Sequence, residues 1–369
     1  MSSSGSTVLP ASTTGPTPAV GGSKRRSATV VVTGTLSVVL AVIVALLPAP
    51  YAIYAPGPVT NVLGAVGGRQ LISVTGRPTY PAKGTLDMTT VEVFGGPGRR
   101  LSLAQVLRSW VSRTQAVVPV EQVFPPGQTS QQVKTENAAE MSQSQQDATA
   151  AGLREVGLTV PERISVASVS SSAPAADVLR RGDVITGFDG SPVADSAALR
   201  QAIGAVRPGA EVTVQVRRNG STVDVRTRTT SQDGRTVLGV GLDPRFDFPV
   251  DVRFATKDVG GPSAGMMFAL GIYDLLTPGE LTGGQKVAGT GTIDPSGQVG
   301  PIGGIAQKLV GARSAGARWF LAPAANCAEV VGNVPDGLRV VRTASLHASR
   351  LAVQAIAAGR GASLPTCTG

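Results

Sequence analysis

The stretch Gly260–Leu270, which reads GGPSAGMMFAL, opens a charge-free apolar run in the last third of the chain. Glycines let the backbone approach a neighbour closely, and a proline suits the first position of a helix, where its missing N–H is no loss. The pattern predicts a buried helix over Pro262–Leu276 with Ser263 in its first turn, beside N–H groups that lack intrahelical partners. Such a place suits a nucleophile whose reaction builds an oxyanion. Taken alone, the stretch is more typical of a tight turn before a packed helix, with Ser263 as the cap and no catalytic role. The residues expected to shape an oxyanion loop are Gly261, Pro262 and Ala264.

Length and charge limit the classes of protein to which this chain can belong. A chain of 369 residues has room for two or three domains with their own cores. The formal net charge is +9, but the basic residues are scattered with few aromatics between them. No nucleic-acid module is visible, so we expect no nucleic-acid partner and some attraction to an anionic membrane face.

Two scarce residue types narrow the chemistry. The one histidine, His347, leaves a Ser-His-Asp triad no other candidate and excludes a multi-histidine zinc site, so we expect no metal and no cofactor. An ordinary surface or cap role is expected for His347.

Lysine is the second scarce residue type, since arginine is this sequence's usual cation. Lys308 is therefore notable, because it lies on an otherwise small or apolar helix over Gly303–Ala315. A buried lysine loses its proton more readily, so Lys308 is a candidate general base for Ser263. Lys257 with Asp258, and Lys286, are interpreted as surface charges.

The N-terminal part predicts a disordered cytoplasmic tail over residues 1–27 and a transmembrane anchor over residues 28–48. The apolar run is about 30 Å long as a helix, which matches the hydrocarbon core of a bilayer. Its basic flank, Lys24 to Arg26, precedes it, so everything after Pro48 is expected outside the cytoplasm. A cleaved signal peptide is the rival interpretation, although the run is long for one and no good cleavage site follows.

Residues 49–156 are expected to form an extracytoplasmic N-terminal region with a helix at about 135–156. Residues 157–243 look like a separate module: a strand over Ile164–Val169, a short helix near Ala173–Leu179, a helix over Asp195–Val206, and a hairpin turning at Asn219-Gly220. With its run APAADVLRRGDVITGFDG, the module resembles a PDZ domain.

The PDZ resemblance implies a peptide-binding groove between the Ile164–Val169 strand and the Asp195–Val206 helix, where an extended peptide adds as a strand. The loop before that strand, at Gly157–Val160, departs from the family's Gly-Leu-Gly-Phe pattern, which puts recognition of C-termini in doubt. The alternative is a PDZ domain that only positions its neighbour. The residues expected to line this groove are Leu158, Ile164, Val166, Leu199 and Ile203.

Residues 244–360 alternate strand and helix, which predicts an α/β layer architecture, and residues 361–369 form a tail. Four motifs in this region resemble, in order and spacing, the proteolytic domain of Lon-type Ser-Lys peptidases. They read GPSAG from Gly261, AGTGTI from Ala288, GQVGPIGG from Gly297, and QKL from Gln307. The resemblance implies Ser263 as nucleophile, Lys308 as general base and Thr290 as their support. Many Lon proteases have an acidic residue where this chain has Gly260.

The whole layout resembles the membrane-anchored PDZ-containing Lon-like proteases of bacteria. The fold class expected is therefore multidomain: an N-terminal transmembrane helix, a β-rich PDZ domain and an α/β (α+β) Lon-type proteolytic domain. No Gly-x-x-x-x-Gly-Lys-[Ser/Thr] occurs, so we expect an ATP-independent serine endopeptidase acting on unfolded or flexible polypeptides. A membrane-tethered PDZ adaptor with an inactive Lon-like domain is the rival. Family resemblance implies a homo-oligomeric ring.

Cys327 and Cys367 are the only cysteines. An even count in a segment expected outside the cytoplasm permits one disulfide, which would fasten the C-terminal tail to the helix near Ala324–Val331. Two unpaired thiols are the alternative.

Overall fold

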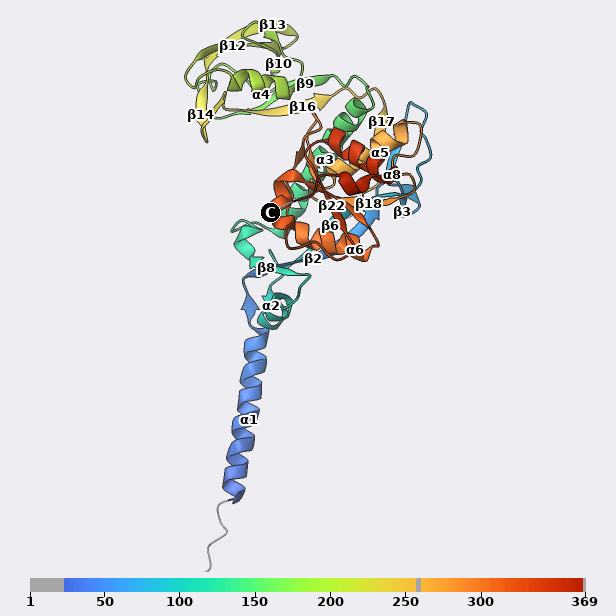
Figure 1. The fold of residues 1–369 in the computed structure, drawn as a ribbon. Helices are drawn as coiled ribbons and strands as arrows, with labels where there is room; N and C mark the ends of the chain where they lie inside the picture. The colour runs from blue at the N-terminus through green and yellow to red at the C-terminus, as the bar shows by residue number, and fades with distance from the viewer. Residues whose placement is uncertain (1–22, 257–259, 368–369) are drawn as a thin grey trace, which may run out of the picture.

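The computed structural model describes residues 23–256 and 260–367, and side chains from residue 29 onward. The expectations for the tail up to residue 22, and for Lys257 and Asp258, lie outside the described residues. Helix α1 (Ser23–Leu46) projects from the folded part of the molecule (Figure 1). Its window Thr29–Leu46 has a mean hydropathy of 2.5 and is not buried against the rest of the chain. The helix is long and apolar enough to cross a membrane, a property that signal sequences share.

The larger folded unit is built on a six-stranded sheet of the described residues, with strand order β22-β21-β18-β6-β2-β8. The first four strands run parallel, and β2 and β8 are antiparallel to their neighbours. The strands are β2 (Tyr51–Asn61), β6 (Thr85–Phe94), β8 (Ala116–Pro119), β18 (Lys286–Gly289), β21 (Trp319–Pro323) and β22 (Arg339–Thr343).

Helices cover both faces of this sheet. Helices α3 (Ser130–Glu155), α5 (Gly265–Leu276) and α8 (Leu346–Ala357) share one core with Leu321 of β21. Helix α6 (Ile305–Ser314) packs in a second core with Phe320 and Ala322 of the same strand. Successive side chains of a strand point to opposite faces, so β21 contributes to both cores and both faces are buried.

Two separate segments of the chain build this unit. The predicted start of the protease domain at residue 244 is therefore wrong. β6 and β2 come from the region predicted to be separate, over 49–156, yet β6 pairs directly with β18. Thr89 Oγ1 donates a hydrogen bond to the Gly289 carbonyl, 200 residues away. Helix α3 also belongs here, because its buried residues pack in the core of α5. The unit's sheet and main core therefore form only when the N-terminal region joins residues 250–367.

The second unit is inserted between α3 and the strand β17 (Asp251–Phe254). Its main sheet has the order β13-β12-β10-β9-β16, with β11 (Ser191–Pro192) beside β10. The members are β9 (Glu162–Val169), β10 (Val184–Phe188), β12 (Glu211–Arg218), β13 (Ser221–Arg228) and β16 (Val240–Phe246). Helix α4 (Ser196–Gly204) is capped by Asp195, whose carboxylate accepts from Ala198 N at 2.8 Å. The segment expected as a short helix near Ala173–Leu179 forms turns instead.

The prediction that a peptide would bind as an extra strand beside β9 is wrong. β9 is an interior strand, because β16 pairs antiparallel with it from Val240 to Phe246. Ile164 and Val166 lie in the core of this unit, and Leu158 packs against the core of the other unit. An open groove of about 1160 Å³ lies instead between α4 and the edge strand β16, and Leu199 and Ile203 are among the residues that line it. Residues of β16 that line it include Val240, Gly241 and Leu242.

Short elements complete the chain. The remaining strands are β1 (Pro48–Ala49), β3 (Ala65–Val66), β4 (Arg69–Gln70), β5 (Ile72–Thr75), β7 (Leu101–Ser102), β14 (Thr230–Gln232), β15 (Arg235–Val237), β19 (Thr292–Ile293) and β20 (Val299–Gly300). The remaining helices are α2 (Leu103–Trp110), α7 (Cys327–Val330), η1 (Val120–Gln122), η2 (Ala324–Asn326) and η3 (Gly361–Ser363).

Candidate active site

Ser263 lies in a turn directly before α5. The helix begins at Gly265, later than the predicted Pro262, because the preceding residues form turns and bends. Gly261 has φ +82°, a conformation that glycine adopts without strain. Gly265 is required for space: a Cβ there would lie 2.8 Å from Ile293 Cγ2. The glycines of this stretch therefore set both the backbone path and the close approach of the neighbouring loop.

Two neighbouring segments hold the turn in place. From α3, Ser144 Oγ donates to the Pro262 carbonyl at 3.0 Å, and the Asn137 carbonyl accepts from Gly261 N at 3.2 Å. From the loop after β18, Gly291 N donates to the Ser263 carbonyl at 2.9 Å. The backbone that carries Ser263 is thus fixed on two sides before any substrate arrives.

Lys308 reaches this turn from α6. Its side chain is only 2% exposed, and its Nζ lies 2.8 Å from Ser263 Oγ and 2.9 Å from Thr290 Oγ1. Burial lowers the pKa of the Lys308 ammonium from 10.5 to about 7. In the described part of the chain, Lys308 forms no ion pair that would oppose this effect. A lysine of this pKa is half neutral near pH 7, the state that a base requires.

Thr290 connects the two residues. It follows β18 at the carboxyl end of that strand and is fully buried. Its Oγ1 donates to the Ser263 carbonyl at 3.0 Å while it accepts from Lys308 Nζ. The sheet explains why Ser263 and Lys308 lie close together. Helices α5 and α6 lie on opposite faces of the sheet, and the loop after β18, which carries Thr290, passes between their N-terminal ends.

Backbone donors remain near Ser263. Within the described residues, the N–H groups of Ser263 and Ala264 donate no hydrogen bond. Pro262 has no N–H, and that of Gly261 is taken by Asn137, so of the expected loop residues only Ala264 keeps a free donor. Two adjacent N–H groups at the start of a 12-residue helix can receive developing negative charge.

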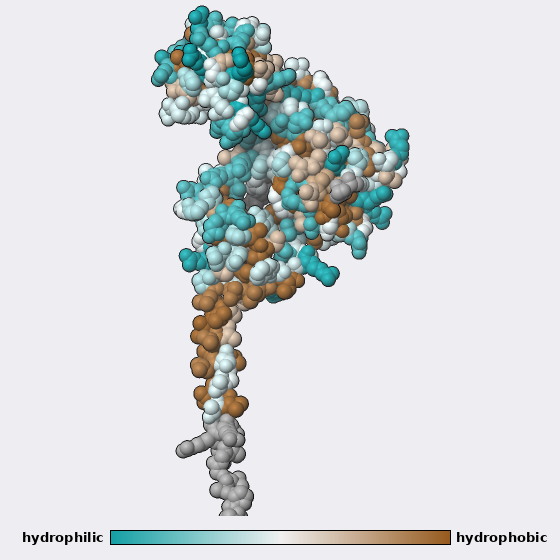
Figure 2. Space-filling model, turned by 60° about the vertical axis from the view of Figure 1, so that its left-hand side comes forward, coloured by the Kyte–Doolittle hydropathy of each residue, from teal (hydrophilic) through white to brown (hydrophobic). Residues whose placement is uncertain are grey.

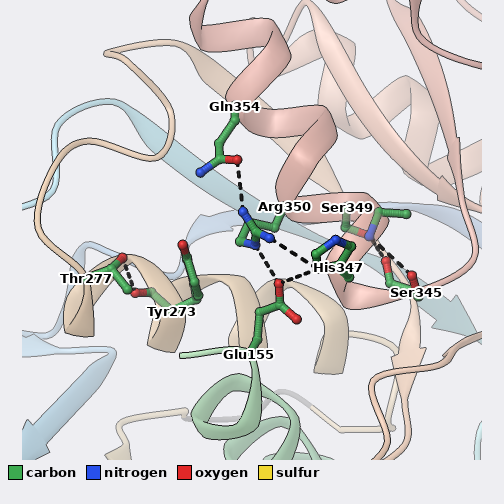
Figure 3. A network of polar contacts seen from close by, with 9 residues as sticks. Glu155, Tyr273, Thr277, Ser345, His347, Ser349, Arg350 and Gln354 are labelled. Atoms are coloured by element: carbon green, nitrogen blue, oxygen red, sulfur yellow. Dashed lines mark hydrogen bonds and ion pairs between the residues drawn. The ribbon is translucent and has the colours of Figure 1, made fainter. Parts of the chain in front are cut away.

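The other candidate residues lie outside this cluster. His347 pairs with Glu155 at 3.0 Å, next to Arg350, and it is 62% exposed (Figure 3). Lys286 bonds the Ala315 carbonyl and lies 3.6 Å from Asp87. His347 therefore contacts a surface network rather than Ser263.

Cys327 and Cys367 form a disulfide with a Cα–Cα distance of 5.0 Å. It joins the C-terminal tail to the start of α7, the arrangement that an even cysteine count permits. The alternative of two unpaired thiols does not hold in this structure.

Sequence reasoning missed two supporting side chains. Ser144 lies on α3, a helix interpreted as polar on most faces, and Asn326 lies in η2. The Asn326 amide accepts from Ile302 N at 3.0 Å and donates to the Ile302 carbonyl at 2.8 Å, which holds the loop ahead of α6. Neither residue type is distinctive in a sequence, and only their burial marks them.

Comparisons with known proteins match both folded units. The Lon protease (S16) C-terminal proteolytic domain matches residues 251–350, and the PDZ domain matches residues 132–229. Lon protease 1 of Herpetosiphon aurantiacus is 38% identical over 94 residues, covering 24% of this chain and 11% of that protein. Lon protease 2 of Syntrophobacter fumaroxidans is 35% identical over 103 residues, covering 28% and 12%. The chain thus spans about a tenth of the length of these relatives.

Among solved structures, the PDZ domain of the SdrC-like protein from Listeria monocytogenes matches with 28% identity and a TM-score of 0.21, covering 21% of this chain and 85% of that one.

The fold and the family matches define a serine protease domain of the Lon type combined with a PDZ domain. Both resemblances predicted from the motifs are confirmed, as is the multidomain fold class with an N-terminal apolar helix. The PDZ match starts within α3, which the structure packs in the protease core.

Proposed function

We propose that this chain is a serine endopeptidase that uses Ser263 as nucleophile and Lys308 as general base. The observation that carries the proposal is the 2.8 Å separation of Lys308 Nζ and Ser263 Oγ at a lysine that is nearly fully buried. A nucleophile and a base within hydrogen-bond reach, with the base held by a third group, are the parts that acyl transfer needs.

The reaction follows from these positions. Neutral Lys308 takes the proton of Ser263 Oγ as that oxygen attacks the scissile carbonyl carbon. The N–H groups of Ser263 and Ala264 stabilise the oxyanion, a kind of contact worth roughly 10²–10³-fold in rate. Protonated Lys308 then gives its proton to the departing amine, which leaves an ester on Ser263. Water loses a proton to Lys308, attacks the ester, and Ser263 regains its proton as the acid product leaves.

Thr290 is a positioning residue in this scheme. Its hydroxyl ties Lys308 Nζ to the Ser263 carbonyl, so the base and the nucleophile's backbone share one fixed point. Fixing reacting groups in advance removes part of the entropic cost of the reaction.

The substrates we propose are unfolded or flexible polypeptides, cleaved without ATP. The sequence contains no Gly-x-x-x-x-Gly-Lys-[Ser/Thr], the phosphate-binding loop of many ATPases. The PDZ domain would select or gate these polypeptides through the groove between α4 and β16, where an edge strand can pair with an extended chain.

We also propose that α1 anchors the chain in the cell membrane, with the N-terminus in the cytoplasm and both folded units outside. The apolar window and the basic residues that precede it in the sequence support this orientation.

Incubation of the full chain in detergent with casein, an unstructured protein, tests the catalytic proposal. Cleavage that disappears in Ser263→Ala protein is expected. Peptide binding without cleavage under any condition would contradict the proposal and favour a PDZ adaptor. Cleavage by both forms would reveal a contaminating protease.

A further inference from the structure

Helix α2 (Leu103–Trp110) presents apolar side chains on two sides. Val106 faces inward, in a small core with Ile53. Away from this core, Leu107 is 50% exposed, Trp110 72% and Val111 83%. Trp110 and Val111 lie three and four positions after Leu107, so the three side chains are neighbours on the helix surface and form a continuous exposed stripe. In the described part of the chain nothing covers this stripe.

The fold fixes α2 beside the end of α1. Leu103 N donates a hydrogen bond to the Leu47 carbonyl at 2.9 Å, one residue after α1 ends. Strand β1 (Pro48–Ala49) also pairs with β7 (Leu101–Ser102). Figure 2 shows the apolar surface of α1 continuing onto the base of the folded part. If α1 spans a bilayer, α2 therefore begins at the level where the chain leaves the hydrocarbon.

The segment of sequence that carries α2 has charge of one sign. Residues 95–119 contain four arginines and no acidic residue. These arginines, all exposed, are Arg99, Arg100, Arg108 and Arg113. Basic residues beside exposed Trp and Leu are typical of helices that lie in the membrane interface, and Trp is enriched there. Anionic headgroups complement such a segment.

We propose that α2 lies in the headgroup region of the bilayer, as a second membrane contact beside α1. The proposal rests on the proposed membrane anchoring of α1. A second copy of this chain is the less suitable occupant, because a symmetric pairing of α2 would bring clusters of arginines together. Because the backbones of Leu47 and Leu103 are joined by a hydrogen bond, no flexible linker separates α1 from α2. Together they set the orientation of the protease domain above the membrane.

Fluorescence of Trp110 tests this contact. The chain has two tryptophans, so Trp319→Phe leaves Trp110 as the only reporter. The full chain is reconstituted in phosphatidylcholine–phosphatidylglycerol vesicles whose acyl chains carry bromine near the carbonyl end. We expect blue-shifted emission and loss of most of it through bromine quenching. The matched control is Trp110→Phe, in which Trp319, in the central sheet, should keep its emission.

A reporter in α1 separates this inference from the anchoring on which it rests. Val38→Trp, in a chain that also carries Trp110→Phe and Trp319→Phe, places a tryptophan in the exposed middle of α1. Its quenching is measured in vesicles of the same headgroups whose acyl chains carry bromine near the methyl end, the depth at which the middle of a spanning helix lies. Quenching at position 38 without quenching of Trp110 would overturn the interfacial contact and leave the anchor intact. Quenching at neither position would overturn both. A blue shift of Trp110 without quenching would show that protein covers the stripe, which also contradicts the proposal.

Discussion

Lys308 Nζ lies 2.8 Å from Ser263 Oγ although 45 residues separate them in the sequence. The contact exists because α5 and α6 approach the end of β18 from opposite faces of the sheet, and because Thr290 at that end bonds both residues. A single amine is therefore held against a single hydroxyl inside the fold. Several of its consequences can be measured.

The first prediction concerns the identity of the base. Lys308→Arg should lower kcat by roughly 10²–10⁴-fold, because arginine stays protonated and cannot accept the serine proton. Initial rates of casein cleavage, with circular dichroism to verify folding, measure this. Lys286→Arg is the matched control, since Lys286 bonds a carbonyl outside the site. Near-normal turnover in purified Lys308→Arg protein would exclude lysine as the base.

The second prediction is a pH profile. Because burial lowers the pKa of Lys308 to about 7, kcat/KM should rise as pH increases and level off above about pH 7, where the amine is neutral. Below that pH the rate should fall about tenfold per pH unit. Hydrolysis of a fluorogenic peptide over this range provides the profile. A rate that is flat down to pH 5 would show that the amine is not the base.

The same lysine should reduce stability in a pH-dependent way. Its pKa is lower in the folded state, so the unfolded chain binds more protons between about pH 7 and 10.5, and stability rises with pH across that window. Lys308→Met fills a similar space without the charge. It should raise the free energy of unfolding by up to about 4 kcal/mol near pH 7, and by progressively less toward pH 10.5. Thermal melts at several pH values test this, and a gain that is constant with pH would contradict it.

A fourth prediction separates the role of the Thr290 hydroxyl, which contacts both Lys308 and Ser263, from the packing of its side chain. Thr290→Val keeps the shape of a fully buried side chain but removes its hydroxyl, so kcat should fall by roughly 10–100-fold, the cost of losing a hydrogen bond to a charged group. Thr290→Ser should restore most of the rate. The pH profile gives a further readout, since only loss of positioning at Lys308 shifts its apparent pKa. Equal losses in both variants would indicate a packing role instead.

The local elements of the last third were predictable from the sequence. The apolar run after Pro262 and the segment that carries Lys308 form helices as expected, with ends displaced by a few residues. The strand expected over Lys286–Ile293 forms as β18 (Lys286–Gly289) and, after a break, β19 (Thr292–Ile293). Periodicity reports which side chains are buried along one element. That information is local, and it was sufficient for these helices and strands.

The pairing of strands could not be predicted in the same way. Nothing in Thr85–Phe94 shows that it lies beside Lys286–Gly289, because burial patterns do not name a partner. The PDZ groove was misplaced for a similar reason. The strand that forms its edge, Val240–Phe246, contains Gly241 and Pro244, which are unfavourable in strands and hide it from propensity arguments.

The last prediction tests the corrected groove. Gly204 ends α4 and lines the groove, and a Cβ there would meet open space, so Gly204→Phe should fill the groove without disturbing the fold. We expect about tenfold weaker cleavage of casein, equivalent to about 1.4 kcal/mol, with hydrolysis of a short fluorogenic peptide unchanged. Gln201→Phe, on the same helix but outside the groove, is the matched control. If Gly204→Phe leaves casein cleavage untouched while Gln201→Phe also has no effect, the groove does not select the substrate, and the PDZ domain only positions its neighbour.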